Sequence, residues 1–169
     1  FPEEINRKMI SSLTDYHFAP TESARNNLLS EGVAKEKIFV TGNTIVDSLD
    51  EVKSKLSSEK YQKKIVSSLS KYLSLDQIKN ELILVTLHRR EKFGSEFENI
   101  LFTLKKLSEK SGYNFIYPVH FNPNVQNPVN KILKNLQNFK FLPPLDYLSF
   151  LYLMSNCKFI RTDSGGIQE

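Results

Sequence analysis

Short apolar segments that recur along the chain, with helical patterns between them, constrain the fold most. The segments are continuous apolar runs rather than alternations of apolar and polar residues, so both faces of each strand are expected to be buried. Strands of this kind, separated by helices, indicate a parallel, doubly wound α/β sheet. The predicted strands are residues 16–20 (YHFAP), 37–42 (KIFVTG), 82–88 (LILVTLH), 113–120 (YNFIYPVH), 139–142 (FKFL) and 158–162 (KFIRT).

Apolar residues with a helical period predict the helices that separate these strands. Residues 21–32 begin at a threonine of N-cap type and end at a glycine, and residues 95–112 show one apolar face with a glycine past their end. Residues 123–136 and 145–156 are predicted to form shorter helices. The Lys/Ser-rich stretch 53–79 keeps a helical apolar stripe, so its lysines form the solvated face of a helix.

The composition narrows the class of protein. A chain of 169 residues with 40% hydrophobic residues can build a core, and it contains no apolar run of membrane-spanning length. We also expect no signal peptide. Its single cysteine, Cys157, excludes an internal disulfide, is predicted to be a small buried residue, and fits a cytoplasmic compartment. The net charge of +4 comes without a nucleic-acid-binding motif, so we expect neither a nucleic-acid partner nor a membrane partner.

Polar clusters directly follow three of the predicted strands. His88 opens one cluster, His120 opens another, and the last strand runs into Asp-Ser-Gly-Gly. Because ligands bind beyond the carboxyl ends of parallel strands, these residues are candidates for a common site. The third histidine, His17, lies inside an apolar segment and is interpreted as a packed core or edge residue.

The final segment, RTDSGGIQE, combines a strand end, a glycine turn and a helix start. Ser164 is of N-cap type, and Gly165 and Gly166 leave the backbone open to a ligand. Free N–H groups at such a helix start form an anion site, and the alternative is an ordinary βα turn.

Several spaced motifs together carry a more specific signal. HRRE, YPVHFNPNV, PLDYLSFLYLM and TDSGGIQE occur in this order after FPEEINR, HFAPTESARNNLL and TGNTIVDSL. This series resembles the non-hydrolysing bacterial UDP-N-acetylglucosamine 2-epimerases over essentially the whole chain. The DSGGIQE form favours the non-hydrolysing branch of the family.

The resemblance implies an α/β fold of two Rossmann-like domains in the GT-B arrangement, truncated at both ends. Residues 1–42 would be the C-terminal part of the first domain, and residues 43–169 would be most of the second, UDP-binding domain. The implied activity is that of an isomerase of polysaccharide biosynthesis. It converts UDP-GlcNAc to UDP-ManNAc by elimination and re-addition of UDP through 2-acetamidoglucal, with no metal and no nicotinamide. The implied partners are UDP-GlcNAc and UDP, with a companion fragment or a second copy of the chain.

The resemblance also implies roles for individual residues. Glu3 matches one of the family's active-site carboxylates, although without the family it reads as a first-turn helix acid. His88 matches the histidine that faces the UDP phosphates, where it would stabilise the leaving group. Phe150 matches an aromatic position near the uracil, although it also fits a core residue. The residues at UDP-binding positions are His88, Phe150, Ser164, Gly165 and Gly166.

Other positions match the family less closely. Arg89 and His120 resemble positions at which some members bind a second UDP-GlcNAc as an allosteric activator. Leu87, Lys92 and Leu145 depart from the usual family residues, which puts the fine geometry of binding in doubt.

Two alternatives stay open on the sequence: a GT-B glycosyltransferase domain, and a non-catalytic remnant that binds UDP or a partner. Function resides in the site and not in the fold, so fold analogy does not choose between them. Because most of the first domain and the end of the second are missing relative to the family, we expect this chain to be inactive alone.

Overall fold

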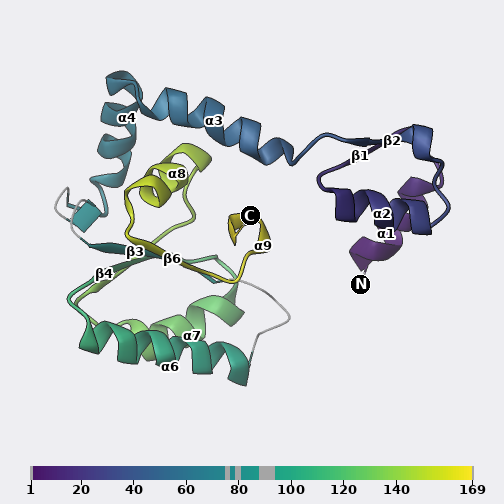
Figure 1. Ribbon diagram of the computed structural model, residues 1–169. Helices are drawn as coiled ribbons and strands as arrows, with labels where there is room; N and C mark the ends of the chain where they lie inside the picture. Colours follow the sequence, from purple (N-terminus) through teal and green to yellow (C-terminus); the bar gives the residue numbers. More distant parts are fainter. Residues whose placement is uncertain (1, 75–76, 79–80, 88–93, 169) are drawn as a thin grey trace. The chain divides into compact units, whose positions relative to one another are not determined.

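The structure is a computed structural model that describes residues 2–168 except 75–76, 79–80 and 88–93. The chain divides into two compact units, Phe1–Lys55 and Leu56–Glu169, and each is described by itself (Figure 1). The division of the chain into two family domains at residues 42 and 43 stays a prediction.

The second unit is built on a parallel sheet, as the apolar runs predict. Within the described residues its strands lie in the order β5-β4-β3-β6, and every neighbouring pair is parallel. Parallel pairing of strands requires crossover connections, which the helices between the strands supply. The strands are β3 (Leu82–Thr86), β4 (Asn114–Pro118), β5 (Phe139–Leu142) and β6 (Phe159–Thr162).

Helices lie on both faces of this sheet. Figure 1 shows α6 (Ser95–Lys110) and α7 (Pro123–Leu133) on one face and α8 (Tyr147–Asn156) on the other. Because successive side chains of a strand point to opposite faces, the central strands β3 and β4 bury residues of both sets, which fits their continuous apolar runs. The outer strands β5 and β6 are covered less completely, and Phe159 of β6 is 56% exposed. Two further helices, α4 (Glu59–Leu69) and α9 (Gly165–Gln168), belong to this unit.

The core beneath α6 and α7 joins alternate strand residues to the apolar faces of the helices. Ile83, Val85, Phe115 and Tyr117 supply the strand side of this core. Its helical period predicts that α6 presents Phe97, Ile100, Leu101, Leu104 and Leu107 on one face. Leu107 departs from this prediction and is 46% exposed, because the buried stripe of the helix continues from Leu104 to Ser108 instead.

Cys157, predicted to be buried, is half-buried instead, between α8 and β6. Its thiol donates to the carbonyl oxygen of Met154 at 3.1 Å, and partial burial raises its pKa. Within the described residues, none of the helices combines the length and the apolar character that crossing a membrane requires.

The first unit contains a smaller parallel sheet. In it β1 (His17–Ala19) pairs with β2 (Ile38–Val40), as predicted, and α2 (Glu22–Ser30) begins where Thr21 accepts the N–H of Ala24. Gly32 follows α2 with a φ of +89°, a left-handed conformation that favours glycine. The remaining elements are α1 (Pro2–Ser11), the 3-10 turn η1 (Lys35–Lys37) and α3 (Thr44–Leu56).

Candidate functional site

The carboxyl ends of the parallel strands of the second unit form one edge of the sheet. Thr86, Pro118, Leu142 and Thr162 end the four described strands, and their pairing in register places them at this edge. A cavity of about 220 Å³ opens here. It is lined by Thr86, Leu87, Pro118, His120, Pro144, Leu145, Phe150 and Ile167.

Two predicted site residues, Phe150 and His120, both line this cavity. Phe150 lies on α8, which starts at Asp146 because that carboxylate accepts both the N–H and the hydroxyl of Ser149. Partial burial opposes ionisation of Asp146, but the hydrogen bonds from Ser149 outweigh it and lower its pKa. The half-buried Phe150 therefore belongs to a cavity wall rather than to the closed core.

His120 is exposed and lies two residues past the end of β4. Its Nδ1 accepts the backbone N–H of Asn122 at 3.1 Å, and the side chain of Asn122 in turn accepts the N–H of Asn124 at the start of α7. An accepting Nδ1 leaves the proton of the neutral imidazole on Nε2. The end of β4 and the N-cap of α7 at Asn122 together hold the His120 imidazole in the wall of the cavity.

The predicted glycine turn connects β6 to α9 at the same edge of the sheet. Ser164 comes directly before α9, and its backbone N–H donates to the hydroxyl oxygen of Thr162 at 2.9 Å. The N–H groups of a first helical turn have no intrahelical partner, so those of Gly165 and Gly166 can serve a ligand. The amide of Ser164, in contrast, is used inside the turn.

The backbone does not explain why residue 166 is glycine. Its φ lies outside the left-handed region, and a Cβ built at Gly166 would meet no heavy atom within 4 Å. Neither strain nor crowding among the described residues therefore requires glycine at this position. A ligand that approaches the backbone here, as the sequence suggests, stays a prediction.

Glu3 lies in the other unit, in the first turn of α1, and is exposed. The backbone N–H of Glu3 itself lowers the pKa of its side chain. His88 and Arg89 lie outside the described residues. The roles of Glu3, His88, Arg89, His120, Phe150, Ser164, Gly165 and Gly166 stay predictions.

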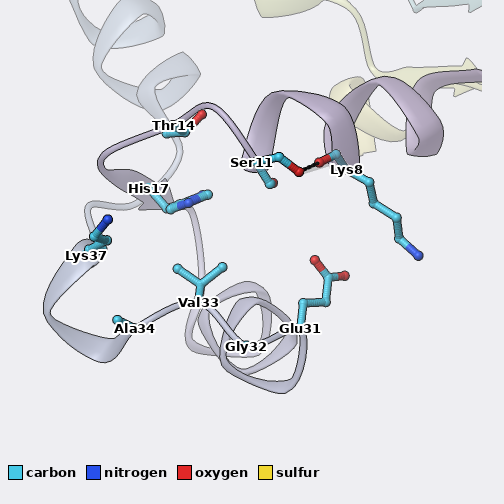
Figure 2. A pocket seen from close by; sticks show the side chains of 10 residues that line it. Lys8, Ser11, Thr14, His17, Glu31, Gly32, Val33, Ala34 and Lys37 are labelled. Atoms are coloured by element: carbon cyan, nitrogen blue, oxygen red, sulfur yellow. Dashed lines mark hydrogen bonds between the residues drawn. The ribbon is translucent and has the colours of Figure 1, made fainter.

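The first unit has a separate polar hollow of about 630 Å³ (Figure 2). Lys8, Lys37 and the half-buried His17 line it together with Glu31, whose carboxylate is paired with Arg7. His17 opens β1, consistent with the strand-edge position that the sequence suggests. Within the described residues, no group of three or more His, Cys, Asp or Glu side chains could hold a metal ion here or elsewhere.

Sequence reasoning missed three hydroxyl-bearing residues that support the cavity: Tyr117, Thr86 and Thr162. The Tyr117 hydroxyl donates to the carbonyl oxygen of Leu87, and the Thr86 hydroxyl donates to that of Thr162. The sequence could have indicated a hydrogen bond of Tyr117, because a tyrosine in a buried strand usually has a partner for its hydroxyl. The partners themselves follow only from the strand order.

The parallel sheet with helices on both faces defines the second unit as a Rossmann-like α/β domain, with a cavity at the carboxyl edge of its strands. The family model for UDP-N-acetylglucosamine 2-epimerase matches residues 1–169. The chain therefore belongs to the UDP-N-acetylglucosamine 2-epimerase family, and its fold is part of the GT-B type of these enzymes.

Individual relatives agree with this placement. A UDP-N-acetylglucosamine 2-epimerase of Yersinia pestis is 47% identical over 170 residues, which are 100% of this chain and 44% of the relative. The Neisseria meningitidis enzyme bound to UDP-GlcNAc superimposes with a TM-score of 0.89 at 40% identity, over 100% of this chain and 45% of that one. The S. aureus MnaA–UDP structure superimposes with a TM-score of 0.81 at 37% identity. This match covers 100% of this chain and 42% of that one. The chain thus spans less than half the length of these relatives.

Proposed function

We propose that this chain forms the UDP-binding part of a UDP-GlcNAc 2-epimerase. The observation that carries the proposal is the cavity at the carboxyl edge of the sheet, which is lined by Phe150, His120 and Ile167 of α9. An aromatic wall suits a uracil ring, and the amides of Gly165 and Gly166 suit a phosphate. Solved relatives described as bound to UDP-GlcNAc or UDP support this choice of ligand.

The proposed reaction of the whole enzyme is the reversible conversion of UDP-GlcNAc to UDP-ManNAc. Anti elimination of UDP gives 2-acetamidoglucal, and re-addition of UDP follows with the configuration at C2 inverted. A base must remove the C2 proton, an acid must return one, and the departing UDP must be stabilised. We assign Glu3 to the carboxylates that act on the sugar and His88 to the stabilisation of UDP, in a cytoplasmic enzyme.

Family membership decides against the glycosyltransferase alternative. A non-catalytic UDP-binding chain is the alternative that the experiment below addresses. A second UDP-GlcNAc at Arg89 and His120, and a companion chain or second copy as partner, remain proposals from the resemblance.

Binding of UDP to the isotopically labelled chain tests the proposal. We expect amide NMR shifts at the carboxyl edge, at His120, Ser164 and Gly166, and none at the amino edge, near Tyr113 and Lys158. If His88 stabilises UDP as assigned, His88→Ala would remove a charge-assisted hydrogen bond and should weaken UDP binding about tenfold or more. His17→Ala, in the other unit, should leave the affinity unchanged. Shifts confined to the amino edge, or an unchanged affinity of His88→Ala, would refute the assignment.

A further inference from the structure

Two sets of hydrogen bonds link three neighbouring strands, β4, β3 and β6, near the carboxyl edge. The Thr86 hydroxyl donates to Thr162 Oγ1 at 2.7 Å, and the Ser164 N–H donates to the same oxygen at 2.9 Å. On the other side of β3, the Tyr117 hydroxyl donates to the Leu87 carbonyl oxygen at 2.6 Å. We call Tyr117 and Thr162 the supporting pair.

Neither member of the supporting pair is among the residues that line the cavity, but both bond to residues that do. Tyr117 holds the main chain of Leu87, and Thr162 holds the side chain of Thr86. Through the Ser164 amide, Thr162 also fixes the segment that leads to Ile167, a third lining residue. The pair therefore contacts the cavity only through its walls.

Strand pairing alone does not require these bonds. Thr86 and Thr162 are already opposite each other in the parallel ladder of β3 and β6, so the main chain aligns the two strands. The bond between the two hydroxyl groups adds a fixed position for the Thr86 side chain and for the turn after Thr162. Its main effect is thus local, at the cavity.

The burial of Tyr117 and Thr86 makes their bonds costly to lose, while Thr162 itself is half-buried. Tyr117 is 0% exposed and Thr86 is 8% exposed, so an unpaired hydroxyl or carbonyl group here would have little access to water. Buried hydrogen bonds of this kind hold neighbouring atoms in one arrangement. A ligand then meets walls that are already in place, which reduces the cost of ordering them on binding.

We propose that Tyr117 and Thr162 are positioning residues of the UDP cavity, which set the Leu87 and Thr86 walls and the turn that follows β6. The inference rests on the proposed function and adds two residues to it.

Isosteric substitutions test the proposal with UDP as the probe. Thr162→Val and Tyr117→Phe each remove one hydroxyl, and both should weaken UDP binding by about three- to tenfold in calorimetry on the folded chain. Thr162→Ser keeps the hydroxyl and should restore the affinity. Thr103→Val on α6 and Tyr113→Phe at the amino edge make the same chemical changes away from the cavity, and should leave the affinity unchanged.

The outcomes separate the two hypotheses. If the wild-type chain binds UDP and the two substitutions lower only the Tm, the pair is merely structural and the inference is wrong. The same holds if Thr162→Ser binds as weakly as Thr162→Val, or if the control variants lose as much affinity. Failure of the wild-type chain to bind UDP would overturn the proposed function, and the inference with it.

Discussion

The hydroxyl of Tyr117 on β4 donates to the carbonyl oxygen of Leu87, the residue after β3, across 2.6 Å, joining residues 30 positions apart. Tyr117 is completely buried, and its burial, together with the charge of Asp163, raises its pKa. The phenol therefore stays neutral and continues to donate throughout the physiological pH range.

Tyr117→Phe should lower the free energy of unfolding by about 1–2 kcal/mol at neutral pH, because the buried carbonyl of Leu87 loses this donor. The raised pKa adds a pH dependence of known sign. The stability that the neutral phenol contributes is complete below the ordinary tyrosine pKa of about 10 and is lost as the pH rises above it. Urea unfolding at pH 8 and pH 10.5 should therefore show a smaller alkaline loss in the variant than in the wild type. Equal losses in both would contradict the assignment.

Arg7→Met should destabilise the first unit. Arg7 bonds to Glu4 within α1 and to Glu31 after α2, at 2.6–2.9 Å, and its hydrogen bonds hold the pKa of both carboxylates below the ordinary range. Because these values are lowered, the stabilisation is present above a pH of about 4.3 and is lost as the pH falls below it.

Circular dichroism melts should therefore show a lower Tm for Arg7→Met at pH 7, with the difference shrinking toward pH 3. Lys63→Met is the control, because it removes an exposed salt bridge, Lys63–Glu59, within a single helix. Its decrease in Tm should be smaller than that of Arg7→Met. A difference that grows in acid would refute the role of Arg7.

Gly166→Ala should separate stability from binding. Alanine in a helical position is favoured over glycine by up to about 1 kcal/mol, and a Cβ at this site meets open space, so the Tm should hold or rise. UDP affinity should fall several-fold if the ligand approaches this backbone. Gly112→Ala is the control: a Cβ there also meets open space, but Gly112 lies at the amino edge of the sheet, so UDP affinity should not change. If both variants bind UDP with equal affinity, the proposed approach of UDP to Gly166 is wrong.

The sequence was enough to predict the six strands that the described residues form and their parallel pairing, because short continuous apolar runs separated by helical patterns are typical of parallel sheets. Burial on both faces holds for β3 and β4 but not for the outer strands, and the order of the strands was not predicted. The sequence also predicted that His120 and the turn at Ser164 lie at one edge, since both follow strands. Side-chain partners were not predictable: the bond from Thr86 to Thr162 depends on β3 and β6 being neighbours, although 76 positions separate the two residues. The exposure of Leu107 likewise depends on how α6 is rotated against the sheet, because the neighbouring Ser108 is the buried residue.

Amide exchange should be faster in residues 2–42 than in the sheet of the second unit. Of the described residues in this range, Ala19 and Ile38 are the buried hydrophobic ones, whereas Leu13 is 88% and Phe18 is 70% exposed. With so little apolar surface removed from water, local opening costs little free energy. Hydrogen exchange read by mass spectrometry should show early deuteration of α1 and β1. Protection there equal to that of β3 and β4 would show that this account of the first unit is wrong.

The 169-residue chain alone should not convert UDP-GlcNAc to UDP-ManNAc. It spans 44% of the length of a relative such as the Yersinia pestis enzyme, and Glu3 is its one match to the active-site carboxylates that the family resemblance implies. Elimination and re-addition need both a base and an acid at the sugar, in a site that excludes water from the glycal. Misplacing a reacting group by about 1 Å can already cost on the order of a hundredfold in rate.

Proton NMR of the purified chain with UDP-GlcNAc checks this prediction, with UDP binding measured in parallel to show that the sample is folded. Activity that appears only after addition of a polypeptide covering the remaining length of a relative would support a divided site. Turnover by the chain alone, at a rate of about 1 per second or more as is usual for enzymes, would mean that residues 1–169 contain every group that the reaction needs.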